Sequence, residues 1–391
     1  MLNSAKIPEL EKAHVVVLTN YLRRHHALVY QEVAKKVGKL SILLSTEMEP
    51  DRGWPAEWGG LDVKVQKNWM HTARSKHSTL FEEPNFIHVP VDTVFQLRRL
   101  KPDIVFSYEM GMRTAFCGLF RLMSRKVPLV MVGNMAEHIE LERGTFRRIL
   151  RRFVRGRSDA ATFNGPSCRR YLQQIGFRDE QLFHFPYCVD EEKTWKGDQQ
   201  FSQGDHRELV YCGSINERKN ILPFTEQLAS WLAEHEEKTV TLSIAGEGEL
   251  VSKVLEFQSD RLNIQMLGNC NPEQLAKAYR DADICAFPSL GDEWGLVPTE
   301  AMKSGIPVLG SLLAQSVEAT VVDNESGWVF DPLDQSSMKD AIGRALSVSS
   351  DELKEMGDRA KSAVAYISPQ FSAEQFCNVV RKAAGQDLVA E

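Results

Sequence analysis

Short apolar runs alternate with helical patterns along most of the chain, and this rhythm predicts a parallel α/β architecture. In the first half, runs of strand length fall at 14–18, 40–44, 86–90, 104–107, 129–132, 160–163 and 182–186. In the second half they fall at 208–212, 239–245, 264–267, 284–287, 306–309 and 327–330. We therefore expect doubly wound sheets with helices on both faces.

A polar stretch separates the two series of strands. Residues 191–206 show no apolar period, and 391 residues are too many for one ordinary core. We predict an N-terminal domain at 1–190, a structureless linker at 191–206 and a C-terminal domain at 207–369.

The stretch 281–310 carries the most chemistry. Its strand is stopped by Pro288, and the loop that follows contains Asp292 and Glu293. Pro298 suits the first position of the next helix, and Gly305 suits its C-terminal cap. Ligands bind at this end of open α/β sheets. The free N–H groups at 295–297 suit a diphosphate, and two carboxylates can hold a sugar and a ribose on either side.

The spacing of Asp292, seven residues and Glu300, with Trp294-Gly295 after the first acid, resembles the paired-acid motif of the retaining glycosyltransferases of family four. That family usually has Glu at the first position. The resemblance, strong over 207–346 and weak over 1–190, implies a GT-B fold. It implies two Rossmann-like doubly wound domains facing a central cleft, with the acceptor in the first, the donor in the second, and a last helix near 370–391 packed back on the first.

Simpler interpretations of the two acids stay open. Glu300 can be a first-turn acid that the helix dipole favours, and Asp292 can be a solvated loop acid. Glu293 is the second choice for the first acid, because its spacing to Glu300 is one residue short.

Other positions of the second domain also match the family. Gly213 and Lys219 have its spacing, Ser214 replaces its usual arginine, and Arg218 can supply that charge instead; the alternative is a solvated basic turn. The resemblance assigns donor binding to Gly213, Lys219, Gly246, Gly248, Ser289, Asp292, Trp294, Gly295, Leu296, Glu300 and Glu318. It assigns catalysis to Lys219, Arg218 and Asp292. Where the family often has a histidine this chain has Asn134, and we expect His138 to act in its place.

Acceptor-side residues are expected at the strand ends of the first domain. The candidates are Arg23, Arg24, Glu109 and Asn134, with His138 one helical turn after Asn134. Ordinary polar strand ends and a solvated helix start are the alternatives. The polar stretch 47–76 shows no clean period and carries three tryptophans, Trp54, Trp58 and Trp69, which can stack on sugars or simply pack.

Thr145–Arg157 is predicted to form an amphipathic helix. Phe146, Ile149, Leu150, Phe153 and Val154 fall on one face, and Arg147, Arg148, Arg151, Arg152 and Arg155 on the other. Such a cationic face suits an anionic membrane surface or a lipid-linked phosphate. The alternative is a core helix whose arginines are solvated.

Composition narrows the class of protein. The chain is 43% hydrophobic and 26% charged, with a formal net charge of −6, so we expect a globular protein without general attraction to nucleic acid. Its seven cysteines form no CxxC pair, the N-terminus lacks a signal-like apolar run, and no run reaches the length of a membrane helix. We expect reduced thiols and a cytoplasmic location, with peripheral contact at the inner face of the membrane.

These observations together predict an enzyme. The resemblance implies a metal-independent, retaining glycosyltransferase without a tightly bound cofactor. It would move a sugar from a nucleotide diphosphate sugar to a glycan, lipid-linked or small-molecule acceptor. The alternatives are a sugar-nucleotide epimerase or hydrolase on the same fold, and a catalytically weak nucleotide-sugar-binding protein.

Overall fold

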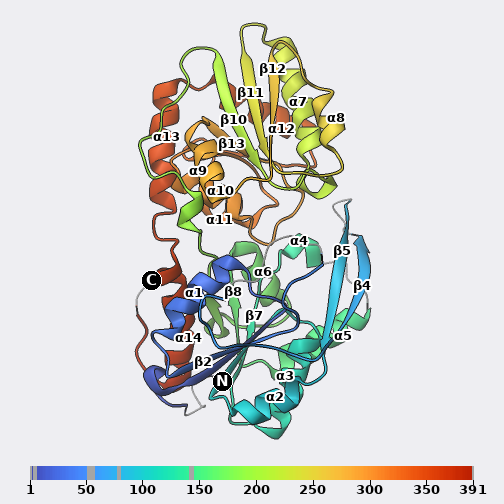
Figure 1. Cartoon of the computed structure of the whole chain (residues 1–391), viewed down its shortest axis with the longest axis vertical. Coiled ribbons are helices and arrows are strands. Elements are labelled where there is room, and N and C mark those ends of the chain that lie inside the picture. Colours follow the sequence, from blue (N-terminus) through green and yellow to red (C-terminus); the bar gives the residue numbers. More distant parts are fainter. Residues whose placement is uncertain (1, 3–6, 51–57, 77–80, 141–144, 390–391) are drawn as a thin grey trace. The chain divides into compact units, whose positions relative to one another are not determined.

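The computed structural model describes residues 2, 7–50, 58–76, 81–140 and 145–389. The chain forms two compact units, which are described separately (Figure 1). Unit 1 comprises Met1–Ser75, Glu83–Cys188 and Ile367–Glu391, and unit 2 comprises Lys76–Glu82 and Val189–Tyr366.

Unit 1 is built on a seven-stranded sheet with the order β3-β2-β1-β6-β7-β8-β9. Its strands are β1 (His14–Thr19), β2 (Lys39–Leu44), β3 (Val63–Val65), β6 (Ile104–Tyr108), β7 (Leu129–Val132), β8 (Ala160–Phe163) and β9 (Leu182–His184). All neighbours are parallel, and Val15 of β1 faces Leu40 on one side and Ile104 on the other. The strand order reverses between β1 and β6, which is where ligands bind in open parallel sheets.

Helices cover both faces of this sheet. They are α1 (Arg24–Ala34), α2 (Thr93–Leu100), α3 (Met112–Met123), α4 (Glu137–Glu140), α5 (Thr145–Arg157), α6 (Pro166–Gln174) and α14 (Pro369–Ala384). The last helix, α14, lies beside α1 (Figure 1), and its Phe376 ring stacks on Phe106 of β6 with centroids 4.0 Å apart. Buried aromatic packing of this kind fixes the end of the chain on unit 1.

The polar stretch 47–76 contains two strands that its sequence pattern does not predict. Besides β3 it contains β4 (Asn68–Lys76), which pairs with β5 (Glu82–Pro90) in a separate two-stranded sheet. Trp69 of β4 is 72% exposed, whereas Trp58 packs against the core of unit 1; Trp54 lies outside the described residues. The pattern fails because a ribbon with exposed apolar side chains has no alternation of apolar and polar positions.

Unit 2 contains a six-stranded parallel sheet with the order β12-β11-β10-β13-β14-β15. Its strands are β10 (His206–Cys212), β11 (Thr239–Ala245), β12 (Leu262–Gly268), β13 (Ile284–Phe287), β14 (Val308–Ser311) and β15 (Gly327–Phe330). Its α-helices are α7 (Ile221–Glu234), α8 (Val251–Leu255), α9 (Pro272–Arg280), α10 (Leu296–Lys303), α11 (Gln315–Thr320), α12 (Gln335–Ser347) and α13 (Ser350–Ala363). The strand order reverses between β10 and β13, so their carboxyl-terminal loops are neighbours.

The segment 191–206 is ordered on unit 2 and is not the structureless linker we expected. It begins with a 3-10 turn, Glu191–Lys193. The Gln199 side chain donates to the carbonyls of Tyr279, Arg280 and Ala282, and the Ser202 N–H donates to Asp283. Because a polar segment can satisfy its groups on a neighbouring element, polarity alone did not reveal this packing.

Over the described residues, no helix combines the length and the apolar character that crossing a bilayer requires. All seven cysteines are free thiols.

Candidate functional site

Two loops at the carboxyl edge of the unit 2 sheet are joined by hydrogen bonds. The first follows β10 and contains the 3-10 turn Glu217–Lys219, where the Asn216 side chain accepts from the Lys219 N–H at 3.1 Å. The second follows β13. Its Leu290 N–H donates to the Arg218 carbonyl at 2.8 Å, and the Ser289 hydroxyl lies 3.3 Å from the same oxygen. The adjacent strands therefore hold the two loops in fixed register.

A charged triad, Arg218, Lys219 and Asp292, connects these loops. Arg218 Nη1 lies 3.0 Å from Asp292 Oδ1, and Lys219 Nζ lies 2.7 Å from Asp292 Oδ2. The side chains of Lys219 and Asp292 are only 12% and 14% exposed. Burial raises the pKa of Asp292, but the charges of Lys219 and Arg218 outweigh it and bring the pKa to about 2. The carboxylate is therefore ionised and carries a cation on each oxygen.

The backbone around Asp292 is also fixed. Its N–H donates to the Leu313 carbonyl and its own carbonyl accepts from the Gln315 N–H, each at 3.4 Å. Three residues later Gly295 has φ +84°, and a Cβ there would lie 2.8 Å from the Phe287 ring. Only glycine combines that conformation with that close approach.

Helix α10 begins earlier than the sequence indicated. It runs from Leu296, so Pro298 is its third residue, not its first. Glu300 therefore lies beyond the first turn, which removes the simple interpretation that the helix dipole alone favours it there. A proline within the first turn loses no intrahelical hydrogen bond, so its position could not fix the helix start.

Glu300 is a buried carboxyl group. It is 3% exposed, the Tyr279 hydroxyl donates to Oε2 at 3.1 Å, and Lys193 Nζ lies 3.9 Å from Oε1. Burial raises the pKa of Glu300, and Lys193 and Tyr279 offset only part of that effect. Sequence reasoning missed Lys193 because it lies in the segment that we expected to be a linker.

The glycine turn after β11 is explained by contact between backbones. A Cβ on Gly246 would lie 1.9 Å from the Gly213 carbonyl oxygen, and one on Gly248 would lie 2.2 Å from that of Ile215. The Ile215 N–H also donates to the Glu247 carbonyl at 2.9 Å. These glycines therefore let the turn press against the loop that carries Arg218 and Lys219.

The remaining predicted donor-side residues differ in burial. Trp294 is buried, with its carbonyl accepting from the Ser316 N–H at 2.9 Å, and Leu296 is partly exposed. Glu318 lies on the exposed side of α11. Their roles in donor binding stay predictions.

The carboxyl edge of the unit 1 sheet has a different chemistry. His26, Tyr30 and Tyr108 form a buried neutral cluster, in which the two tyrosine hydroxyls lie 2.6 Å apart. The His26 ring centroid is 5.2 Å from that of Tyr108. Burial, together with the charge of Arg23, lowers the pKa of His26 well below its usual value, and burial raises the pKa of both tyrosines. The start of α1 is therefore not wholly solvated, because His26 is buried there.

The predicted acceptor-side residues occupy the ends of β1, β6 and β7. The Arg23 Nε donates to the Tyr21 hydroxyl at 3.0 Å, and Arg24 is exposed. Glu109 has a left-handed backbone (φ +64°). Asn134 is buried, and His138 is partly exposed in α4.

Arg113 is a buried residue of this edge that sequence reasoning missed. Its guanidinium donates to the Asn20 side chain, the Ser45 hydroxyl and the Tyr108 carbonyl, and lies 3.9 Å from the Glu109 carboxylate. It thereby ties together the loops after β1, β2 and β6. No local signal in a helical arginine distinguishes this arrangement from a solvated side chain.

Helix α5 has the predicted bounds, but its faces are only partly those we expected. Arg151 forms an ion pair with Glu140, and Arg155 binds the Gly176 carbonyl and lies over the Phe177 ring. Ile149, which we expected to pack, is 65% exposed. Arg148 and Arg152 are also exposed. The predicted faces are confirmed for Leu150, Phe153 and Val154, which pack in the core, and for the exposed Arg148 and Arg152. The prediction is wrong for Ile149, which is exposed, and for Arg151 and Arg155, because arginine stems pack readily on apolar and aromatic surface.

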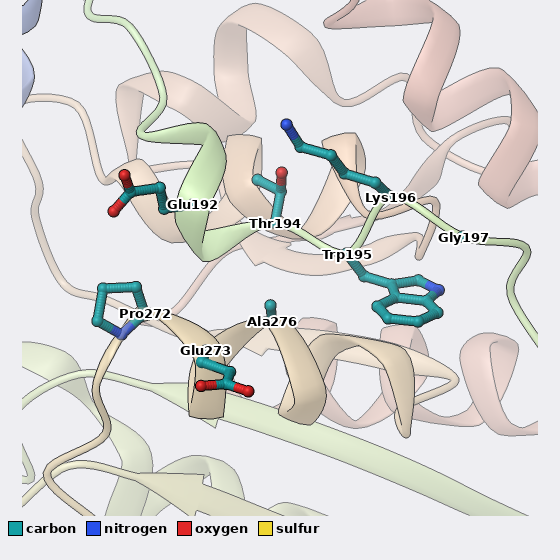
Figure 2. A pocket seen from close by; sticks show the side chains of 8 residues that line it. All are labelled: Glu192, Thr194, Trp195, Lys196, Gly197, Pro272, Glu273 and Ala276. Carbon is teal, nitrogen blue, oxygen red and sulfur yellow. The ribbon is translucent and has the colours of Figure 1, made fainter.

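A hollow of about 560 Å³ lies on unit 2 between residues 192–197 and α9 (Figure 2). Figure 2 shows the Trp195 side chain reaching toward α9, whereas Lys196 extends away from it. Its lining residues are Glu192, Thr194, Trp195, Lys196, Gly197, Pro272, Glu273 and Ala276. None of the predicted donor-binding residues is among them.

Similar solved structures define the fold. The lipopolysaccharide outer core galactosyltransferase WaaB matches with a TM-score of 0.68 at 13% identity, over 94% of this chain and 99% of that one. Anabaena HepE in complex with UDP-glucose matches with a TM-score of 0.68 at 14% identity, over 95% of this chain and 100% of that one. At these identities the likeness concerns the fold alone, and it confirms the predicted GT-B class with two Rossmann-like units.

A family match covers most of unit 2. Residues 193–363 match the model of the family "Glycosyl transferases group 1". A curated relative, the D-inositol 3-phosphate glycosyltransferase of Corynebacterium urealyticum, is 31% identical over 141 residues, which are 35% of this chain and 33% of that protein. The chain spans about half the length, or less, of the first curated relatives it matches.

Proposed function

We propose that this protein transfers a sugar from a nucleotide diphosphate sugar to a carbohydrate, lipid-linked or small-molecule acceptor, with retention of configuration. The charged triad is the observation that carries the proposal, because it concentrates two cations at the carboxyl edge of a family-matched parallel sheet. The difficult chemical event is the departure of a nucleoside diphosphate from an oxocarbenium-like sugar. Groups that stabilise the negative charge developing on the diphosphate accelerate that step.

The residues of unit 2 divide this work. Lys219 and Arg218 stabilise the leaving diphosphate, helped by the free N–H groups at the start of α10. Glu300 accepts a hydrogen bond from the ribose, and Asp292 accepts hydrogen bonds from the donor sugar. Gly213, Gly246, Gly248 and Gly295 let the backbone come close to the nucleotide, and Ser289, Trp294, Leu296 and Glu318 complete its surroundings.

The acceptor side belongs to unit 1 in this proposal. Arg23, Arg24, Glu109, Asn134 and His138 would bind and orient the acceptor hydroxyl. Support comes from their positions at strand ends on both sides of the point where the strand order reverses. His138 is proposed to take part in catalysis.

A ligand screen tests the donor assignment. HepE, one of the similar structures, holds UDP-glucose, so UDP sugars are the first to try, followed by GDP-mannose. At a hundred times its Kd, a bound donor should raise the free energy of unfolding by about 2.7 kcal/mol. The proposal fails if no nucleotide sugar stabilises the protein. Consumption of a donor without any acceptor would favour the epimerase or hydrolase alternative.

The predicted membrane contact of α5 involves fewer residues in our proposal. We propose that Arg148 and Arg152, with the exposed Ile149 between them, bind an anionic lipid surface. An apolar side chain flanked by cations suits the boundary between lipid headgroups and acyl chains. Arg151 and Arg155 are left out because both are only partly exposed.

A further inference from the structure

The charged triad leaves little of its charge available to a ligand. Each Asp292 carboxylate oxygen faces one cation, at 2.7 Å from Lys219 Nζ and 3.0 Å from Arg218 Nη1. Arg218 also donates to the Gly291 carbonyl at 3.1 Å, and the Lys219 ammonium lies 5.0 Å from the centre of the Phe287 ring. Both cations assigned to the diphosphate are therefore engaged by a carboxylate of the protein.

We propose that Asp292 is an internal counter-ion that occupies the phosphate-binding cations until the donor replaces it. This inference rests on the proposed function and goes beyond it: donor binding becomes an exchange of one anion for another. The diphosphate takes Lys219 and Arg218, and the carboxylate released from them becomes available to the hydroxyls of the donor sugar. One residue thus couples recognition of the two halves of the donor.

The short side chain at this position fits the exchange. Hydrogen bonds on both sides fix the Asp292 backbone, and an aspartate has only two side-chain torsions with which to follow a cation. When Lys219 and Arg218 turn toward a phosphate, the carboxylate cannot stay with both. A glutamate, one methylene longer, would follow more easily.

The burial of this site explains why the two cations require a negatively charged partner both before and after the donor binds. Lys219 is largely buried, and an ammonium group removed from water without a partner is strongly disfavoured. In the empty site Asp292 meets that need, and in the loaded site the diphosphate does. The affinity for a nucleoside diphosphate is consequently lower than two uncompensated cations would give, which favours release of the product.

The test is calorimetric titration of the full-length protein with inorganic pyrophosphate, UDP and GDP. Pyrophosphate carries no base, so it measures the exchange independently of the donor's identity. The variants are Asp292→Asn, which keeps the shape and removes the charge, and Asp292→Glu, which keeps the charge. Glu247→Gln is the matched control, because Glu247 is an exposed acid on the neighbouring turn after β11. Circular dichroism verifies that each variant is folded.

Asp292→Asn should bind pyrophosphate and the nucleoside diphosphate about tenfold more tightly than the parent protein. Asp292→Glu should bind no more tightly than the parent, because it keeps the charge, and Glu247→Gln should change the Kd by less than about twofold because exposed charges are screened. Turnover by Asp292→Asn should nevertheless fall, since the contact with the sugar is lost.

Unchanged or weaker binding by Asp292→Asn overturns the inference, because Asp292 would then serve to hold the cations in place for the phosphate. If the parent protein itself still binds pyrophosphate or a nucleoside diphosphate, the proposed function is not affected by that result. If neither the parent nor Asp292→Asn binds any of the three probes, the proposed function fails together with the inference.

Discussion

The carboxyl edges of the two sheets have the same architecture and opposite chemistry. In unit 2 the edge holds charges, with Asp292 ionised between Lys219 and Arg218 and a pKa of about 2. In unit 1 the edge is lined by the neutral cluster, where burial lowers the pKa of His26 and raises that of Tyr30 and Tyr108. Charged side chains also lie at the unit 1 edge, among them Arg113 and Glu109, but within the described residues only this edge has a neutral cluster beside them.

This difference shows which part of a parallel α/β fold can vary without a change of architecture. Both sheets reverse their strand order at the central pair, β1 and β6 in unit 1 and β10 and β13 in unit 2. The backbone geometry is therefore shared, and the side chains of a few loop residues decide which ligand each edge can take. Four measurements can break or sharpen the comparison.

The largest effect is expected for Lys219→Ala. Removing a charge directed at the leaving diphosphate should slow sugar transfer by about a hundredfold, or about 3 kcal/mol, with little change in folding. Steady-state turnover and thermal unfolding measure the two quantities. Lys238→Ala is the control, because it removes a lysine paired with the exposed Asp205 of the same unit. A folded Lys219→Ala protein with normal turnover would place the chemistry elsewhere.

Glu300→Gln should reduce the preference for a ribose. The lost charge-assisted hydrogen bond corresponds to about 2 kcal/mol for UDP and much less for 2′-deoxy-UDP. Titration of both nucleotides into the parent and the variant gives the ratio of their Kd values. If that ratio is the same in the two proteins, Glu300 does not contact the ribose.

As the pH falls, unit 1 should lose stability before the ion pairs of the charged triad lose theirs. Because the folded-state pKa of His26 lies below the usual 6.5, the unfolded chain takes up the proton first as the pH falls. Unit 1 should therefore lose up to about 1.4 kcal/mol per pH unit below pH 6.5, until the folded-state pKa is reached. His14, whose pKa is also lowered, acts in the same direction. The depressed pKa of Asp292 means that its contribution is lost only between its ordinary 3.8 and about 2.

Hydrogen exchange between pH 5 and pH 7.5, followed by mass spectrometry on peptides from α1 and α10, separates the two units. His26→Gln should flatten the pH dependence of α1, and the exposed His71→Asn should leave it as in the parent. A pH dependence that survives His26→Gln would show that the neutral cluster is not the acid-sensitive element.

The smallest effect per residue is expected at α5. Replacing Arg148 and Arg152 by Gln should reduce sedimentation with anionic vesicles at low salt, at about 1 kcal/mol per arginine. Lys354→Gln with Lys361→Gln on α13 removes the same charge from unit 2 and should leave sedimentation unchanged. Equal recovery of the parent protein in the supernatant with and without vesicles would exclude the contact.

The sequence predicted unit 2 better than unit 1 for physical reasons. Asp292 and Glu300 have a local spacing on one loop and one helix, so the two acids could be selected from the sequence, although Lys193 beside Glu300 could not. Arg113 draws its partners from the loops after β1, β2 and β6, and nothing local announces such an arrangement. Apolar runs located the buried strands well and also the second half of β5 at 86–90, whereas β4 has no hydrophobic pattern to detect.

The hydrogen bonds between residues 191–206 and the rest of unit 2 determine where the chain can be cut if unit 2 is to be produced alone. A fragment cut at 207, where the strand pattern begins, would lack Lys193 beside Glu300. It would also leave three carbonyls near the end of α9 without the Gln199 amide that covers them. A protein engineer who exchanges unit 2 between relatives should therefore make the cut before Glu191 and move that segment together with the sheet.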